Sequence, residues 1–129
     1  MKVCPIGWHL PNYEEWLALV LKVGNTARAG KILKAKNGWC CDGNGTDDYG
    51  FTALPSGKGF NIDGLYKFYE VNFSAIWWDA REKYGVYVIF AHPLSDMAGE
   101  DNHWSSWDEN TLVSVRCIQN TALPKGTAK

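Results

Sequence analysis

The residues near the start of the chain have types and spacing that could support catalysis. The segment CPIGWHLPNYEEW (residues 4–16) contains a cysteine, a histidine and two glutamates. A cysteine becomes a catalytic nucleophile when a histidine activates it and a third group orients that histidine. Here a proline follows Cys4 and the segment runs directly into a helix start, so we expect His9 to pack with a ring nitrogen on a backbone carbonyl. Glu14 and Glu15 are adjacent and point in different directions on a helix, which disfavours an acid–base pair.

Two other stretches carry possible metal ligands. In DGNGTDD (residues 42–48), oxygen donors of the kind that bind calcium come from Asp42, Asn44, Thr46, Asp47 and Asp48. The glutamate that completes an EF-hand loop is missing, so we expect a solvated turn. The pair Cys40-Cys41 has no second cysteine pair or histidine cluster with which to form a zinc site. We predict no metal and no cofactor.

The adjacent cysteines leave their own redox state open. Consecutive Cα atoms lie about 3.8 Å apart, which is below the roughly 4.4–6.8 Å that a disulfide usually spans. The alternatives for Cys40 and Cys41 are a strained bridge between them, two free thiols, or pairing with a different cysteine; we favour the first two.

Ligand binding is indicated by two stretches that mix aromatic and polar side chains, WWDAREKY (residues 77–84) and GEDNHWSSWDEN (residues 99–110). Such mixtures bind sugars through stacking and hydrogen bonds, and tryptophans ringed by polar residues are typical hot spots of protein interfaces. Trp104 and Trp107 could instead cover a loop-rich core. The candidate ligand-binding residues are Trp78, Asp79, Arg81, Tyr84, Asp101, Asn102, His103, Trp104, Trp107 and Asp108.

The element that follows the opening segment is a helix over residues 12–23. Asn12 is a good N-cap, and Glu15 three residues later completes a capping box. A core-facing stripe with helical spacing is formed by Trp16, Leu19, Val20 and Val23. Gly24 and Asn25 then end the helix. A second, shorter helix is capped by Thr26 and interrupted by Gly30, and the chain becomes extended at residues 32–33.

The rest of the chain is predicted to contain loops and short strands. Residues 37–50 are rich in Gly, Asn and Asp, which excludes regular structure there. A short strand that Pro55 ends is predicted in FTALPSG (residues 51–57), and Asp63-Gly64 is a candidate hairpin turn. Further strands are predicted at residues 75–80, 85–92 and 111–119, with one of Trp77 and Trp78 pointing inward. The last strand should bury Val113, Val115 and Cys117. This order predicts an α+β fold with an antiparallel sheet.

Composition limits the organisation and the partners. The 129 residues suffice for one domain, which we place at residues 1–120, with residues 121–129 as a flexible tail or linker. A net charge of −1 disfavours nucleic acid as a partner. No apolar run reaches the roughly 20 residues that a membrane span needs, so we predict no membrane insertion. Met1 does not begin a signal peptide, so the protein is either cytosolic or lacks a leader that was removed.

Four blocks of the sequence carry a family resemblance. In this order, CPIGWHLPNYEEW, NGTDDYGFTALPSG, IWW and VSVRCI resemble the Fibrobacter succinogenes major paralogous domain, and together they span residues 4–119. That family looks like a branch of the C-type-lectin-like fold near the formylglycine-generating enzymes. The resemblance implies an N-terminal helix packed on short antiparallel strands with long loops, and chain ends that meet. The match is loose over residues 84–110.

The resemblance also implies a pairing for the two outer cysteines. Because the chain ends lie together in such a fold, a disulfide between Cys4 and Cys117 is expected, with two buried thiols in a cytosolic protein as the alternative. The bridge would contribute about 4–5 kcal/mol in the chain-entropy model. Family members are secreted or surface-exposed bacterial proteins, often lipoproteins, and usually have more sequence before the Cys-Pro. We therefore expect a secreted or cell-surface location and an upstream domain missing from this chain.

These observations favour a non-catalytic ligand-binding or adhesion module of a bacterial surface or phage-like protein. Its ligand would be a glycan or a protein, held by the loop surface of residues 78–84 and 99–110. The alternatives are a variable receptor-binding protein diversified by a retroelement, and a purely structural surface module. A formylglycine-generating type of enzyme needs a copper-binding cysteine pair in the C-terminal part, and Cys117 has no such neighbour. We therefore predict that the protein is not an enzyme.

Overall fold

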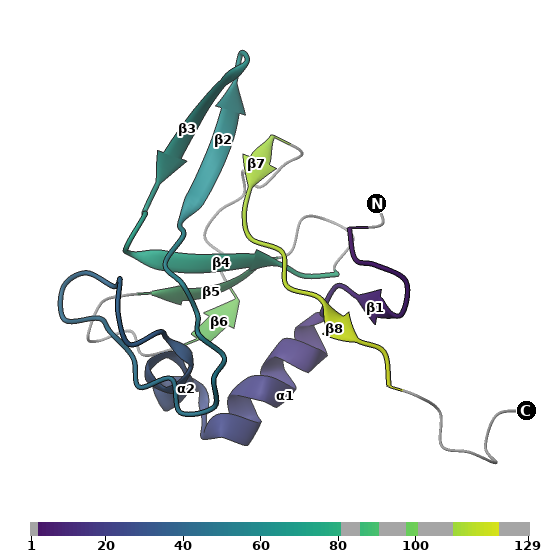
Figure 1. Ribbon diagram of the computed structural model, residues 1–129, viewed down its shortest axis with the longest axis vertical. Coiled ribbons are helices and arrows are strands. Elements are labelled where there is room, and N and C mark those ends of the chain that lie inside the picture. The colour runs from purple at the N-terminus through teal and green to yellow at the C-terminus, as the bar shows by residue number, and fades with distance from the viewer. Residues whose placement is uncertain (1–2, 81–85, 91–97, 101–109, 122–129) are drawn as a thin grey trace, which may run out of the picture.

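The structure is a computed structural model that describes residues 3–80, 86–90, 98–100 and 110–121. It is an α+β arrangement in which every pairing between named strands is antiparallel, as the sequence predicts (Figure 1). The strands form three small sheets, with the orders β1-β8, β3-β2-β7 and β4-β5-β6. The elements are β1 (Trp8–His9), α1 (Tyr13–Val23), α2 (Thr26–Leu33), β2 (Lys58–Ile62), β3 (Leu65–Tyr69), β4 (Ser74–Trp78), β5 (Val86–Phe90), β6 (Ala98–Glu100), β7 (Thr111–Leu112) and β8 (Ile118–Gln119).

Helix α1 begins and ends where the sequence predicts. The side chain of Asn12 accepts a hydrogen bond from the Glu15 backbone N–H at 2.8 Å. The Glu15 carboxylate in turn accepts from the Asn12 backbone N–H at 3.0 Å, which completes the capping box. The helix ends at Gly24, whose φ of 155° is accessible to a glycine. Three residues of the predicted stripe are buried and the fourth, Leu19, packs against the core as a half-buried side chain.

Helix α2 differs from its prediction in two ways. Its N-cap is Asn25, one residue earlier than predicted, because the Asn25 side chain accepts from the Arg28 backbone N–H at 3.1 Å. The helix also continues through Gly30 to Leu33, so the predicted interruption and the extended residues 32–33 are wrong. A glycine inside a helix costs about 1 kcal/mol. Burial of Ala29 and Leu33 in the core exceeds that cost, which is why the helix persists.

The predicted hairpin is present as β2 and β3. Asp63 and Gly64 both have positive φ, 52° and 81°, as a two-residue turn of the I′ kind requires. Ile62 and Leu65 face each other directly across this turn. Strand β7 pairs with the other edge of β2, where Gly59 lies opposite Leu112. The hairpin extends away from the two helices (Figure 1).

Two predicted strands are not continuous in the structure. The stretch 51–57 makes a single bridge, between Ala53 and Lys34. The predicted strand 111–119 is divided into β7 and β8, and Ser114 between them forms a parallel bridge with Trp77. This last segment contacts β2, β4 and β1 in turn, so it cannot follow one sheet along its whole length. The predicted burial of Val115 is also wrong, since its side chain is 46% exposed.

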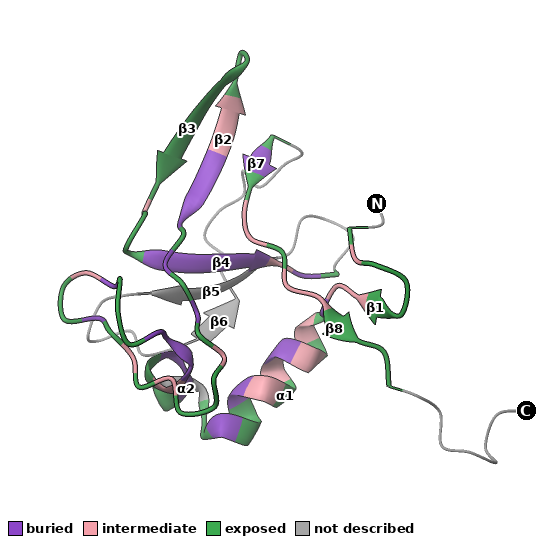
Figure 2. Cartoon of the chain, in the orientation of Figure 1, coloured by how far each residue is buried: buried purple, intermediate pink, exposed green. Residues whose placement is uncertain are grey.

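The core forms where α1, α2 and β4 meet (Figure 2). Trp77 from β4 is 5% exposed, and its ring centroid lies 5.4 Å from that of Trp16 and 5.9 Å from that of Phe51. Trp78 projects from the opposite face of the strand and packs, half-buried, with Val113 against Ile76. Only Trp77 therefore points into the main core, as predicted, while the other face of β4 has a smaller cluster of its own.

Candidate functional site

The cysteine of the opening segment, Cys4, has a structural role. Cys4 and Cys117 form the expected disulfide, with Cα atoms 5.9 Å apart and a sequence separation of 113. The pairing of β1 with β8 places Trp8 opposite Gln119 and brings the two ends of the described chain side by side. Because its sulfur is bonded to that of Cys117, Cys4 is not available as a nucleophile.

His9 also joins the two ends, but through partners other than those predicted. Its Nε2 lies 2.7 Å from Glu15 Oε1 and its Nδ1 lies 2.6 Å from Asn120 Oδ1, so both partners are side chains and neither is a backbone carbonyl. Both partner atoms are acceptors, and a doubly protonated ring can donate to both. The pKa of His9 is raised, chiefly by the hydrogen bond to Asn120 and secondly by the hydrogen bond to Glu15. This arrangement explains how the ring is held and assigns it no substrate.

Glu15 has two structural roles at once. Burial raises the pKa of its carboxyl, but the backbone N–H of Asn12 and the ring of His9 lower it by more, and the net shift is downward. The ionised carboxylate therefore both caps α1 and pairs with His9. Glu14, its neighbour, is exposed. Glu15 therefore has the capping role that the sequence predicts.

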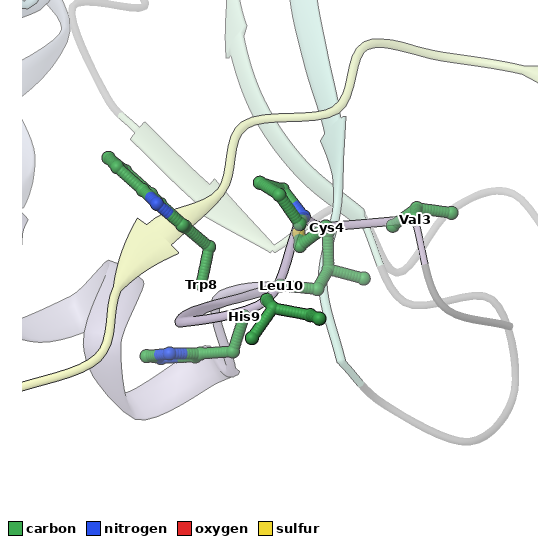
Figure 3. A pocket seen from close by; sticks show the side chains of 7 residues that line it. Val3, Cys4, Trp8, His9 and Leu10 are labelled. Carbon is green, nitrogen blue, oxygen red and sulfur yellow. The ribbon is translucent and has the colours of Figure 1, made fainter.

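An open hollow lies beside the disulfide, and Figure 3 shows the side chains that line it. The only lining group that titrates is His9, whose ring nitrogens are already hydrogen-bonded. The lining is otherwise mostly apolar, and Ile6 and Trp8 are exposed at its rim. Apart from His9, none of the side chains that line the hollow is an acid, a base or a free metal ligand, since the sulfur of Cys4 is in the disulfide. Its residues are Val3, Cys4, Pro5, Ile6, Trp8, His9 and Leu10.

Of the five predicted oxygen donors at residues 42–48, Asn44, Thr46 and Asp47 form side-chain hydrogen bonds within the protein. The Asp47 carboxylate accepts from the Thr52 backbone N–H and hydroxyl, both at 2.7 Å, and these bonds lower the pKa of Asp47. Asn44 Oδ1 accepts from the Trp39 backbone N–H at 3.0 Å. Within the described ranges, no group of three or more His, Cys, Asp or Glu side chains is arranged to hold a metal ion.

Cys40 and Cys41 are free in the structure, and their sulfur atoms lie 2.7 Å apart. Cys41 is exposed and Cys40 is half-buried. Burial, together with the hydrogen bond and charge of the neighbouring thiol, raises the pKa of Cys40 to about 11. Of the alternatives left by the sequence, pairing with Cys4 or Cys117 is excluded because those two are joined to each other.

Most of the predicted ligand-binding residues lie outside the described residues, and for them the prediction stands as it was made. These are Arg81, Tyr84, Asp101, Asn102, His103, Trp104, Trp107 and Asp108. Of the two that are described, Trp78 is half-buried at the end of β4. Asp79 follows it and is 4% exposed, so its carboxylate lies inside the protein.

Each of the two predicted stretches meets the described C-terminal segment, residues 110–121, at one of its ends. The Trp78 backbone N–H donates to the Ser114 carbonyl at 3.1 Å, so the first stretch starts next to the C-terminal segment. The second stretch ends at Asn110, whose carbonyl accepts from the Asn61 backbone N–H in β2 at 3.0 Å. The first stretch therefore contacts this segment at Ser114, four positions after Asn110, where the second stretch joins it. The second stretch also ends at the hairpin.

The hairpin itself carries a surface that the sequence reasoning missed. All five residues of β3 are exposed, and the apolar ones include Leu65 at 67%, Tyr66 at 59% and Phe68 at 65% (Figure 2). We define the hairpin surface as the exposed apolar residues Ile62, Leu65, Tyr66, Phe68 and Tyr69. The sequence LYKFY (residues 65–69) could have indicated this surface, because it has large apolar residues on both faces of a strand. A strand at the edge of a small sheet cannot bury both faces.

An ion pair between a buried lysine and a partly exposed glutamate lies at the base of this hairpin. Lys58 Nζ lies 3.0 Å from Glu70 Oε1, and the Lys58 side chain is almost fully buried. The other oxygen of Glu70 accepts from the Ser74 hydroxyl at 2.8 Å. These bonds join the first residue of β2, the residue after β3 and the first residue of β4. The hairpin therefore projects from a firmly held base.

Comparison with known proteins identifies one family. The family model described as the Fibrobacter succinogenes major domain matches residues 1–119, nearly the whole described chain. No curated protein and no solved structure matches. None of the helices in the described ranges has the length and apolar character required to cross a membrane.

Proposed function

Because the chain belongs to the Fibrobacter succinogenes major domain family, we propose that it is a non-catalytic binding module of a bacterial surface protein, and that its ligand is a protein. We also propose that it has a C-type-lectin-like arrangement. Two features support this arrangement: the ends of the domain are joined by β1 and β8, and a disulfide locks them. Disulfides persist mainly in oxidising environments, which supports a secreted or cell-surface location.

The hairpin surface is the observation that carries this proposal. By strand alternation, Ile62, Leu65 and Tyr69 lie on one face of the hairpin, and Tyr66 and Phe68 lie on the other, so the apolar surface wraps around the exposed strand. Exposed apolar surface on a soluble protein is often an interaction site. Tyr66, Phe68 and Tyr69 are aromatic residues, a class enriched in interface hot spots. Within the described strands, β3 has β2 as its one neighbour, so its other edge presents backbone groups that a partner strand can bond.

A protein ligand is favoured over a glycan by the composition of this surface. Ile62 and Leu65 are branched aliphatic side chains that offer a sugar neither a flat face nor a hydrogen bond. Lys67 is the one charged residue of β3. Sites for sugars instead combine aromatic faces with several hydrogen-bonding groups. The predicted stretch 99–110 has that mixed composition and ends at Asn110 beside β2, so we include it in the proposed binding surface.

A non-catalytic role is supported by the positions of the reactive groups. The formylglycine-generating type of chemistry uses a copper-binding cysteine pair, and here the Cys117 sulfur is bonded to that of Cys4. The ring of His9 and the carboxylate of Glu15 hold the two chain ends and the start of α1. These groups therefore stabilise the fold and are not free to act on a substrate.

The proposal is tested by selecting ligands for the purified domain from a library of displayed random peptides, with a glycan array in parallel. We expect enriched peptides whose affinity falls at least about tenfold when Phe68 or Trp104 is changed to Ala, since loss of a hot-spot aromatic costs about 2 kcal/mol or more. Leu21→Ala is the matched control, because Leu21 is an exposed apolar residue on α1, away from the hairpin.

The other outcomes each identify a different function. Glycan binding that Trp104→Ala abolishes and Phe68→Ala leaves unchanged would identify a sugar-binding module. Folded wild-type protein that binds nothing in either screen would indicate the purely structural module. Peptide binding that neither variant weakens would show that the proposed surface is wrong.

A further inference from the structure

The pair Cys40-Cys41 lies in a loop that the binding surface does not use. We propose that these two cysteines form a reversible redox site, which closes into a disulfide between neighbouring residues when a low-molecular-weight disulfide such as oxidised glutathione is present. The sulfur atoms already lie 2.7 Å apart as free thiols. The remaining two cysteines of the chain are bonded to each other, so Cys40 and Cys41 are the only possible internal partners of one another.

The backbone around the pair is held in place from several sides. The Cys40 backbone N–H donates to the Asn72 carbonyl at 3.0 Å, and its carbonyl accepts from the Gly43 N–H at 2.8 Å. Cys41 adopts a φ of 59°, in the left-handed region that residues with a side chain seldom occupy. The preceding residue, Trp39, is fixed by its indole N–H, which donates to the buried Ala53 carbonyl at 3.0 Å. The short distance between the sulfur atoms is thus built into a hydrogen-bonded turn.

The two thiols differ in a way that sets the order of the reaction. Cys41 is exposed, so the oxidant meets it first. Its sulfur attacks oxidised glutathione, one glutathione leaves as the thiolate, and a mixed disulfide forms on Cys41. Cys40 then loses its proton and attacks the Cys41 sulfur, and the second glutathione leaves. Overall the two protein thiols lose two hydrogen atoms and one oxidised glutathione becomes two reduced molecules.

The second step takes place within one molecule, which favours the disulfide between Cys40 and Cys41 over a second mixed disulfide with glutathione. The raised pKa of Cys40 keeps its sulfur protonated at neutral pH, so this step is slower than a thiol of ordinary pKa would allow. A bridge between adjacent residues is also more easily reduced than an ordinary one, because neighbouring Cα atoms are closer together than a relaxed disulfide prefers. Strained bridges of this kind are the labile, switchable ones, in contrast to relaxed structural disulfides.

The test uses the full chain in buffers with graded ratios of reduced to oxidised glutathione, followed by rapid alkylation of free thiols and tryptic digestion. Cleavage after Lys36 and Lys58 yields the peptide 37–58, which contains Cys40 and Cys41 and neither of the other cysteines. We expect this peptide to become lighter by two hydrogen atoms, to lose both alkyl labels, and to exceed the doubly glutathionylated form by roughly tenfold. Excess reduced glutathione should reverse the change while Cys4 and Cys117 remain linked.

The variants Cys40→Ser and Cys41→Ser serve as matched controls. Each retains one thiol, so each should accept one glutathione and never form the lighter peptide. The proposal is overturned if the wild-type peptide keeps both labels at every ratio, if it accumulates two glutathiones, or if it is found linked to a second copy of itself. All of these species differ in mass and are resolved in one digest.

Discussion

Replacing both Cys4 and Cys117 by serine should remove a large share of the stability of this domain. The bridge joins residues 113 positions apart, so it closes nearly the whole chain into one loop. In the folded protein the same ends are also held by the β1–β8 pairing and by the hydrogen bonds of His9. The folded structure should therefore persist without the bridge, and the main effect should lie in the freedom of the unfolded chain.

The magnitude follows from the length of the closed loop. The chain-entropy model assigns a loop of this size an entropy loss of about 16 cal/mol/K, which corresponds to about 5 kcal/mol at 25 °C. A single domain is typically stable by about 5–15 kcal/mol. Without the bridge, the variant should be marginally folded at 25 °C and should unfold at much lower temperature and denaturant concentration than the wild type.

The assay is equilibrium unfolding in guanidinium chloride, followed by the fluorescence of the buried Trp16 and Trp77. With a slope of roughly 4 kcal/mol per molar denaturant, the loss corresponds to a midpoint lower by about 1.2 M. The double variant Cys40→Ser/Cys41→Ser is the control, because it also removes two sulfur atoms but opens no loop, and its free energy of unfolding should change by less than about 1 kcal/mol. A loss below about 2 kcal/mol in the bridge variant would refute the reasoning, since the unfolded chain would then already keep its ends together.

Three further perturbations test individual contacts. Because the pKa of His9 is raised in the folded protein, His9 stabilises the fold fully below about pH 6.5, and this stabilisation is lost as the pH rises through the folded-state pKa. Because the pKa of Glu15 is lowered, Glu15 stabilises the fold above about pH 4.5, and this stabilisation is lost as the pH falls. The unfolding midpoint should therefore peak between these two pH values, and His9→Gln should abolish the decline on the alkaline side. Gly57→Ala should cost roughly 2–4 kcal/mol in the same unfolding assay, because Gly57 has a φ of 67° and a Cβ there would collide with the Tyr69 carbonyl; an unchanged midpoint would contradict this close approach. Trp77→Ala should cost about 3–5 kcal/mol by calorimetry or denaturant unfolding, and a loss under about 1 kcal/mol would show that its ring lies outside the core.

The elements that the sequence predicted well are those whose hydrogen bonds are local. The capping box of α1 joins Asn12 and Glu15, only three residues apart. The hairpin turn depends on Asp63 and Gly64 alone, since these residues accept the positive φ that the turn needs. Such contacts form between near neighbours whatever the rest of the chain does, so they can be read from a short window of sequence.

Apart from the N-cap of α2, the predictions that failed concern residues whose environment comes from distant parts of the chain. Gly30 stays helical because Ala29 and Leu33 are buried against the core, which residue spacing could not show. Residues 111–119 alternate like one strand, yet they are shared among three neighbouring elements and form two short strands. The partners of His9 differ from the prediction for the same reason, since Asn120 lies 111 positions away.

By itself, the sequence determined the family, the first helix, the hairpin turn and, through the family resemblance, the bridge between Cys4 and Cys117. Tertiary structure alone decided that β3 is exposed on both faces, that Asp79 lies inside, and that the sulfur atoms of Cys40 and Cys41 are in contact. The physical reason is that burial is a property of the whole fold. A side chain is covered only if some other segment arrives to cover it, and the residues of that segment can lie anywhere in the chain.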